Sequence, residues 1–257
     1  MSQATEERRK KIMAQLLDSK HVTVKELAQS MDVSGATVRR DLRALADEDE
    51  LLLVHGGATL PRQRDFSFQA KQLRAVEEKR VIGRLAAALV RDGDQVFLDS
   101  GTTCFEMVPY LKRTHGATVL TNSARLALEL NAPGLSVLLI GGEYRPDRMD
   151  TVGPMAISAI NQVRGYVAFI GADGLRMDFG PSASDVASAH LHRLVVENAR
   201  EAVLLVDSSK FGGASLFQIV DWTRISKVVT DREPDQQWKR FFEEKNIEVI
   251  YPGETKD

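Results

Sequence analysis

The sequence predicts an α/β protein in which a small N-terminal winged helix-turn-helix precedes a larger domain built on a mostly parallel sheet. Two observations support this fold class. Residues 23–45 read as two short helices joined by a tight turn, which is the spacing of a helix-turn-helix. From Gln95 onward, short apolar runs alternate with helical stretches, as is typical of a parallel sheet covered on both faces. We expect domains at 1–60 and 76–257, with a linker at 61–75.

The composition is that of an ordinary globular protein without disulfide bonds. Of its 257 residues, 43% are hydrophobic and 27% are charged, and the single cysteine, Cys104, excludes an internal disulfide and a cysteine-cluster zinc site. The first twenty residues are too charged for a secretory signal, and no apolar run approaches the roughly 18 residues that span a bilayer. We expect a cytoplasmic protein with no cofactor and no membrane partner. Because the net charge is −2, any contact with DNA must come from locally clustered charge.

The first helix is expected from Glu6 to Ser19, because apolar residues recur there on one side of a helix. These residues are Ile12, Met13, Leu16 and Leu17. The basic run from Arg8 to Lys11 follows two glutamates, and we interpret it as a solvated face in preference to a set of phosphate contacts.

Capping residues mark the two helices that follow. Thr23 and Glu26 have the spacing of a capping box, which opens the second helix. A turn over 32–34 ends at Ser34, a good N-cap for the third helix. The third helix is expected to face the core with Val38, Leu42 and Leu45.

The opposite side of the third helix suits a DNA major groove. Small residues at its start allow close approach to the groove floor, Thr37 can bond a base edge or a phosphate, and arginine forks match guanine edges or phosphates. The candidate DNA-binding residues are Ser34, Gly35, Ala36, Thr37, Arg39, Arg40 and Arg43. The alternative is a small helical hairpin whose arginine face is simply exposed.

The run LLLVHGGATL at 51–60 predicts a strand pair with a sharp turn at Gly56 and Gly57, which would form a wing against DNA. The acidic run from Asp47 to Glu50 is expected to fill the wing turn. Residues 1–60 hold nine Lys/Arg and ten Asp/Glu, a net charge of −1. Because an acidic wing would be repelled by phosphates, DNA binding is expected to depend on the third helix, the linker and oligomerisation.

The stretch 61–80 carries six Lys/Arg against three Asp/Glu. It predicts an extended connector from Pro61 to about Phe68, followed by a helix that leads into the second domain. Its positive charge is compatible with contacts to the DNA backbone and equally with a solvated linker.

Seven short apolar runs predict the strands of the larger domain: QVFL, ATVLT, SVLLI, YVAFIG, AVLLV, KVVT and IEVIY. Ligands of parallel sheets bind at the carboxyl ends of the strands, and five polar or glycine-rich turns follow these runs. The first turn opens a helix expected from about Cys104 to Leu111. These five turns suit a small anionic, polyhydroxylated ligand. The first turn and Lys210 are expected to bind its phosphate, and Asp173 and Asn122 are expected to bind its hydroxyls. The candidate effector-binding residues are Asp99, Ser100, Gly101, Thr102, Thr103, Thr121, Asn122, Ser123, Gly142, Asp173 and Lys210.

These spacings resemble the DeoR-type bacterial regulators. The resemblance is carried by Arg9, Met13, Leu17, Ser34, Thr37, Val38, Arg39, Arg40, Asp41, Leu42 and the segment His55-Gly56-Gly57-Ala58. The polar turns, within residues 76–251, resemble the effector domain of that family, which is similar to ribose-5-phosphate isomerase and glucosamine-phosphate deaminase. The resemblance implies a winged helix-turn-helix followed by a phosphosugar-isomerase-like α/β domain. It also implies a phosphorylated sugar, or a close relative, as inducer.

The chain departs from the family pattern after the Gly171 turn. Relatives usually show Gly-x-Thr-Thr and then a helix with an acidic residue, whereas this chain has GPSA at 180–183 and His190 near the usual acid. An isomerase of this fold would need a glutamate base, so its loss argues against catalysis. His190 and His192 are expected to be ordinary helix-surface or interface histidines. They lie about 200° apart on a helix, so we expect no metal site there.

The main hypothesis is a transcriptional repressor of a carbohydrate-utilisation operon, released from its operator by a phosphorylated sugar or sugar derivative. Its expected partners are double-stranded operator DNA, the small effector and further copies of the chain in a dimer or tetramer. The alternatives are an enzyme, namely a sugar-phosphate isomerase or deaminase, and an activator with the same parts.

Overall fold

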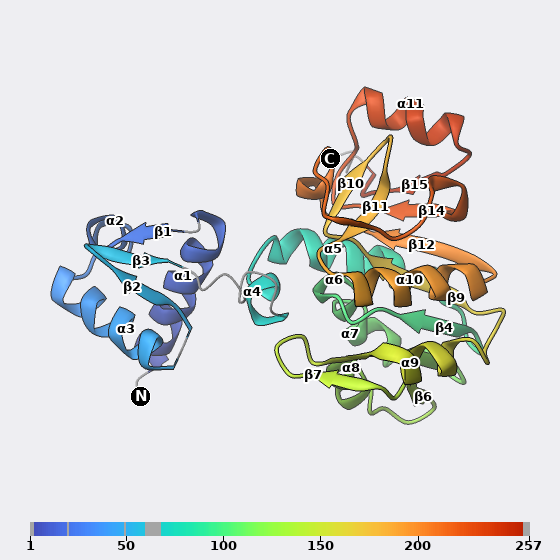
Figure 1. Ribbon diagram of the computed structural model, residues 1–257, viewed down its shortest axis with the longest axis horizontal. Coiled ribbons are helices and arrows are strands. Elements are labelled where there is room, and N and C mark those ends of the chain that lie inside the picture. Colours follow the sequence, from blue (N-terminus) through green and yellow to red (C-terminus); the bar gives the residue numbers. More distant parts are fainter. Residues whose placement is uncertain (1–2, 20, 49, 60–67, 254–257) are drawn as a thin grey trace. The chain divides into compact units, whose positions relative to one another are not determined.

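The computed structural model describes residues 3–19, 21–48, 50–59 and 68–253, and the chain divides into two compact units, 1–74 and 75–257. Figure 1 shows both units, and each is described here by itself. Residues 61–67 of the expected linker lie outside the described residues. Its remainder contains the helix α4 (Phe68–Gln72), which belongs to the first unit.

The N-terminal unit is a winged helix-turn-helix. Its elements are α1 (Gln3–Ser19), β1 (His21–Thr23), α2 (Val24–Ser30), α3 (Gly35–Asp47), β2 (Leu52–Val54) and β3 (Gly57–Thr59). The three strands form an antiparallel sheet in the order β1-β3-β2. Its core is made by apolar side chains of all three helices, including Ile12, Leu16, Leu27, Val38 and Leu42. The predicted capping box is confirmed: the Glu26 N–H donates to Thr23 Oγ1 (3.2 Å), and the Thr23 N–H donates to Glu26 Oε2 (3.0 Å).

The predicted acidic wing turn is wrong. The hairpin register pairs Val54 with Gly57, so the wing turn is His55-Gly56. Gly56 has φ +77°, and a Cβ on Gly57 would lie 2.0 Å from the Val22 carbonyl oxygen, so both glycines are required by the turn and the close strand contact. The acidic run belongs elsewhere: Asp47 ends α3, Glu48 caps it, and Asp49 lies outside the described residues.

The C-terminal unit is built on a seven-stranded sheet in the order β15-β14-β12-β9-β4-β5-β6, and every neighbouring pair is parallel. All seven predicted strands are confirmed. They are β4 (Gln95–Leu98), β5 (Thr118–Thr121), β6 (Ser136–Leu139), β9 (Val167–Gly171), β12 (Glu201–Leu205), β14 (Lys227–Val229) and β15 (Glu248–Ile250).

Helices cover both faces of this sheet (Figure 1). One hydrophobic cluster packs the sheet against α9 (Gly153–Ile160), α10 (Val186–Asn198) and α11 (Gln236–Glu244). A second cluster packs it against α5 (Val76–Ala87), α6 (Thr102–Phe105), α7 (Val108–Leu111) and α8 (Ala124–Glu129). Strand residues alternate between them: Phe97 joins the first cluster, and Val96 and Leu98 join the second.

The helix expected after β4 is broken into α6 and α7. Pro109 lies in the first turn of α7 and has no N–H to donate to the Phe105 carbonyl, so a continuous helix loses a bond there. None of the helices in the described ranges is long and apolar enough to cross a membrane.

Short antiparallel strands that the sequence did not predict lie outside the main sheet. One pair is β7 (Glu143–Arg145) with β8 (Asp150–Val152), and a three-stranded group contains β10 (Gly174–Arg176), β11 (Gly180–Ala183) and β13 (Phe217–Gln218). Two 3₁₀ turns complete the unit, η2 (Ser208–Lys210) and η3 (Trp222–Arg224).

Candidate functional site

The start of α3 is organised by its N-cap. Ser34 Oγ accepts a hydrogen bond from the Thr37 N–H (3.1 Å) and lies 2.9 Å from the Thr37 hydroxyl oxygen. These bonds satisfy one of the free amides at the helix start and hold the two hydroxyls together. Gly35 leaves the first turn unobstructed beside Arg39, whose Nη1 would lie 3.6 Å from a Cβ at position 35.

The structure places six of the seven candidate DNA-binding residues on the part of α3 that is not packed into the core, and the seventh, Ser34, is the N-cap of this helix. Val38, Leu42 and Leu45 are buried as predicted, whereas Arg39, Arg40 and Arg43 are exposed. None of these three guanidinium groups pairs with a carboxylate anywhere in the part of the chain that the structure describes. Three uncompensated positive charges on one helix face suit a surface that neutralises DNA phosphates or reads guanine edges.

A buried ion pair that the sequence did not predict fixes the orientation of α3. Asp41 lies on the buried side of the helix and accepts a hydrogen bond from Arg8 Nε at 2.6 Å, with Arg9 Nε at 3.5 Å. Arg9 also approaches Glu48. The interpretation of Arg8 and Arg9 as part of a solvated face is therefore wrong, because both side chains bind α1 to α3.

In the C-terminal unit, the candidate effector residues follow strands β4, β5, β6, β9 and β12 at the carboxyl edge of the sheet. Asp99 is the central residue of this edge. Its Oδ2 accepts a hydrogen bond from the Gly171 N–H (3.0 Å), and its Oδ1 lies 2.8 Å from His192 Nε2. Ser100 Oγ donates to Asp150 Oδ2 (3.1 Å), so the β4 turn is joined to β8. Gly101 is needed there, because its Cβ would lie 2.9 Å from Asp99 Oδ2.

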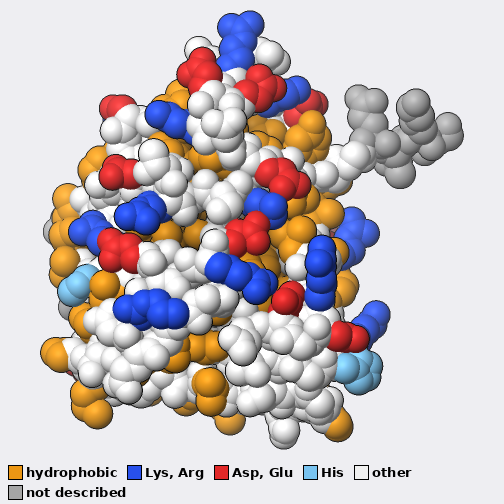
Figure 2. Space-filling model, turned by 90° about the vertical axis from the view of Figure 1, so that its right-hand side faces the viewer, with side chains coloured by type: hydrophobic (Ala, Val, Ile, Leu, Met, Phe, Trp, Pro, Cys, Tyr) orange, Lys and Arg blue, Asp and Glu red, His pale blue; other side chains and the backbone are white. Residues whose placement is uncertain are grey.

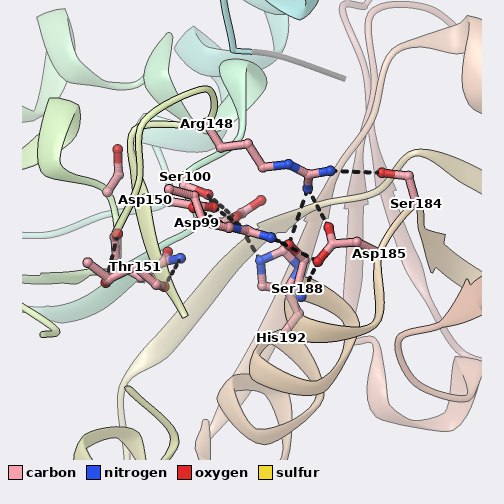
Figure 3. A network of polar contacts seen from close by, with 12 residues as sticks. Asp99, Ser100, Arg148, Asp150, Thr151, Ser184, Asp185, Ser188 and His192 are labelled. Atoms are coloured by element: carbon pink, nitrogen blue, oxygen red, sulfur yellow. Dashed lines mark hydrogen bonds and ion pairs between the residues drawn. The ribbon is translucent and has the colours of Figure 1, made fainter. Parts of the chain in front are cut away.

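Two arginines from the β7–β8 hairpin bind this edge, and sequence reasoning missed their role. Arg145 donates to both Asp150 oxygens, from Nε at 2.8 Å and Nη2 at 2.7 Å, and its Nη1 donates to Asp185 Oδ1 at 2.9 Å. Arg148 donates to the other Asp185 oxygen and approaches Ser184 and Ser188. Figure 3 shows how Arg148 reaches across from the hairpin to Asp185 at the start of α10.

Asp185 has two kinds of partner. It is the N-cap of α10, where Oδ1 accepts from the Ser188 N–H (2.9 Å), and it pairs with both arginines. Burial alone would raise the pKa of Asp185, but the Ser188 bond and the two guanidinium groups outweigh it and hold the pKa at about 2. The carboxyl is therefore ionised at neutral pH.

The remaining candidates contribute in different ways. Asn122 Nδ2 donates to the Thr151 carbonyl, whereas its Oδ1 is buried without a hydrogen-bond partner in the structure. Thr121 Oγ1 and Ser123 Oγ accept from the backbone of the turn that opens α8, so these hydroxyls organise the turn itself. Gly142 leaves room for β8, because its Cβ would lie 2.5 Å from the Val152 carbonyl oxygen.

The other predicted effector-binding residues are Thr102, Thr103, Asp173 and Lys210. Thr102 and Thr103 begin α6, which has only four residues, so its dipole gives little help in anion binding. Asp173 accepts from the Ser184 N–H (2.8 Å), next to the Arg148 contact. Lys210 lies in η2, and no bond joins its ammonium to the arginine network among the residues that the structure describes.

His192 is not an ordinary surface or interface residue, so that expectation is wrong for this histidine. Its side chain is buried, with 7% exposed, and Nε2 pairs with Asp99, whereas Nδ1 is without a partner. Burial alone would lower the pKa of His192, but the Asp99 carboxylate, followed by Asp150 and Asp185, raises it above the ordinary value.

His190 is exposed, as expected, and lines a groove on α10. The other lining residues are Val186, Ala189, Arg193, Leu216, Phe217 and Gln218. No group of histidine, cysteine or acidic side chains suited to a metal ion occurs among the described residues.

Two family models match this chain: the DeoR C terminal sensor domain over residues 74–232 and the DeoR-like helix-turn-helix domain over residues 8–64. The chain belongs to the DeoR family. The predicted family is therefore confirmed over almost the whole length of the two units.

Relatives of this DeoR-family chain are transcriptional regulators. It is 32% identical to the HTH-type transcriptional regulator GlpR of Haloferax volcanii, over 95% of this chain and 96% of that protein. It is 30% identical to the HTH-type transcriptional repressor GlcR of Bacillus subtilis, over 95% of each chain. It is also 29% identical to the lactose phosphotransferase system repressor of Staphylococcus epidermidis, over 89% of this chain and 92% of that protein. The chain is accordingly a DeoR-family transcriptional regulator.

Solved structures similar to this DeoR-family chain include a D-ribose-5-phosphate isomerase in complex with phospho-erythronic acid. The TM-score is 0.40, with 16% identity over 53% of this chain and 54% of that one. This likeness concerns the fold alone.

Proposed function

We propose that this DeoR-family regulator represses a carbohydrate-utilisation operon and is released from its operator by a phosphorylated sugar or sugar derivative. The observation that supports the DNA-binding half is the exposed face of α3, where Arg39, Arg40 and Arg43 have no acidic partner among the described residues. The lactose phosphotransferase system repressor among its relatives supports a carbohydrate context.

The arginine network supports an anionic effector. Arg148 pairs with Asp185 while both side chains stay partly exposed, so a phosphate could take the place of the carboxylate. Arg145 is held more firmly, because it contacts both Asp150 and Asp185. In this proposal Arg148 binds the effector phosphate, and Asn122 Oδ1, which lacks a partner, accepts a bond from a sugar hydroxyl.

The proposed coupling to DNA is modest in energy. Paired helix-turn-helix heads must meet two half-sites about one helical turn, or a multiple of one, apart. An effector that favours a different head spacing therefore weakens operator binding, and a coupling free energy on the order of 1–3 kcal/mol is enough.

A gel-shift titration tests the proposal. The full chain should shift the DNA upstream of its own gene at physiological salt, and a panel of sugar phosphates should contain one that releases it. Arg40→Ala should weaken the shift, with a cost of about 1–3 kcal/mol in discrimination. Arg148→Ala should keep the shift and lose the release.

Arg176→Ala is the matched control, because Arg176 makes an exposed pair with Asp178 away from the network. This variant should bind DNA and respond to the effector as the wild type does. Absence of any specific shift would refute the DNA-binding role, and normal release of Arg148→Ala would place the phosphate site elsewhere.

A further inference from the structure

Strand β6 is at the edge of the seven-stranded sheet and has an open side. Its register with β5 is parallel, and the Ser136 N–H donates to the Ala117 carbonyl (3.0 Å) and the Ile140 N–H to the Thr121 carbonyl (2.8 Å). In a parallel ladder the intervening residues point their backbone groups the other way. The N–H and C=O of Val137 and Leu139 therefore face outward, where the described residues supply no further strand.

The side chains of β6 leave this edge unprotected. Leu138 is 51% exposed and Leu139 is 48% exposed. They lie on opposite faces, because Ile140 packs in the cluster with α9 and α10, whereas Val137 packs against the cluster with α8. Natural proteins protect edge strands with lysine, proline or a bulge, and the four residues of β6 include none of these.

The opposite edge of the sheet is different. There β15 carries Glu248, which pairs with Lys227 at 2.6 Å, and Pro252 follows the strand. A charged strand followed by proline resists the addition of another strand. A head-to-tail contact between the β6 edge of one copy and the β15 edge of another is therefore disfavoured.

Exposed apolar side chains are concentrated in the segment of the chain that contains β6. Of the seven large hydrophobic side chains that are exposed in the described part of the C-terminal unit, five fall within residues 128–155. These are Leu128, Leu138, Leu139, Tyr144 and Met155. Figure 2 shows charged side chains of both signs over the upper and middle parts of this view, and separate hydrophobic side chains along the lower margin. Such a gathering of apolar groups marks an interaction site.

We propose that β6 is a dimerisation edge, at which a second copy of this chain adds its own β6 antiparallel to the first. The two-fold axis passes beside Leu138, so Leu138 faces Leu138 of the partner subunit as a non-hydrogen-bonded pair. Val137 then exchanges two hydrogen bonds with Leu139 of the partner subunit, and Leu139 does the same with Val137 of the partner subunit. Every outward backbone group of the two residues is satisfied, and the two sheets become one.

A second copy is the occupant that the edge itself favours. Residues near a two-fold axis face their own copies, so a charge there would meet a like charge. The strand Ser-Val-Leu-Leu carries none. The helices that cover the two faces each carry an exposed apolar side chain as well, Met155 on α9 and Leu128 on α8. Apolar side chains are therefore exposed on the helices of both faces.

Disulfide trapping tests the register. Facing residues of a non-hydrogen-bonded pair have Cα atoms about 4.5 Å apart, whereas the two copies of residue 139 would be roughly 8 Å apart, beyond the limit of about 7 Å for a disulfide. Leu138→Cys should form a covalent dimer under mild oxidation of the full chain. Leu139→Cys, almost equally exposed, should not, and neither should the wild type, whose Cys104 is buried. Equal trapping of both variants, or of neither, would overturn the proposal.

Sedimentation velocity provides a second test that requires no cysteine. Leu138→Lys places two like charges at the axis and should halve the mass of the wild-type assembly while the circular dichroism spectrum stays unchanged. Leu216→Lys is the matched control, because Leu216 is the most exposed apolar side chain of the α10 groove, remote from β6 in the fold. An unchanged mass for Leu138→Lys, or a monomeric wild type at micromolar concentration, would contradict the β6 dimer.

Discussion

At the scale of single residues, Asp41 determines how α3 is held against α1. It is a carboxylate on the buried side of α3, between the apolar Val38 and Leu42, and it connects to α1 through Arg8 and Arg9. Removing one partner of a buried charge pair leaves the other charges without compensation. The exposed arginines of α3 have the opposite character, because they pair with no carboxylate in the described part of the chain.

Asp41→Asn should therefore destabilise the N-terminal unit without altering the exposed arginines of α3. We expect a loss of about 1–3 kcal/mol in the opening free energy of α1 and α3, the range for an unsatisfied buried group. Hydrogen exchange of the amides in residues 3–47 measures it. Asp47→Asn, at the exposed end of the same helix, is the control and should change little; equal effects from both would mean that the Arg8 pair contributes nothing.

His192 should make stability depend on pH. Its folded-state pKa is raised, mainly because Asp99 outweighs the effect of burial. Its stabilising contribution is therefore complete below the ordinary value of about 6.5 and is lost as the pH rises through the raised pKa. The Tm of the C-terminal unit should fall as the pH rises from about 6.5 through the raised pKa of His192, and His192→Gln should flatten this fall. His190→Gln should retain it, and a wild-type Tm that does not vary with pH would contradict the assignment.

At the scale of elements, the strands that form apolar runs could be predicted and the polar ones could not. Strands of a parallel sheet covered by helices read as apolar runs, so all seven could be found in the sequence. The β7–β8 hairpin has the strands Glu-Tyr-Arg and Asp-Thr-Val, which form no apolar run and are too short to show a period of two. Its arginines were missed because Arg145 meets Asp185 from 40 residues away. A signal for His192 did exist, because it shares the buried side of α10 with Ala189 and Val195.

The charge of the wing can be changed by substitution in its exposed strand. The exposed strand β2 is Leu52-Leu53-Val54, so it offers DNA no positive charge. Leu53→Arg should add one phosphate contact, raise non-specific DNA affinity, and steepen the slope of log K against log salt by about 0.9. Leu53→Gln is the uncharged control. An unchanged slope for the arginine variant would show that the wing does not approach the phosphate backbone.

At the scale of the whole molecule, the two units have separate hydrophobic cores and separate proposed ligands. Communication between them must be a coupling free energy, since a ligand shifts an equilibrium only by its differential affinity for two states. In the proposed scheme the β6 dimer determines how far apart two reading heads lie, and the effector at the Arg148 network changes which spacing is favoured.

Such coupling is reciprocal, and this gives a prediction that does not depend on knowing the conformational change. If a sugar phosphate weakens operator binding by a given factor, the operator must weaken binding of that sugar phosphate by the same factor, on the order of 5- to 150-fold. Isothermal titration of the effector into the full chain, alone and saturated with operator, measures it. DNA of scrambled sequence at the same charge is the control, because it separates coupling from simple electrostatic competition between two anions. Equal effector affinity with and without operator would mean that the sugar phosphate acts on repression by another route, even if the gel shift responds to it.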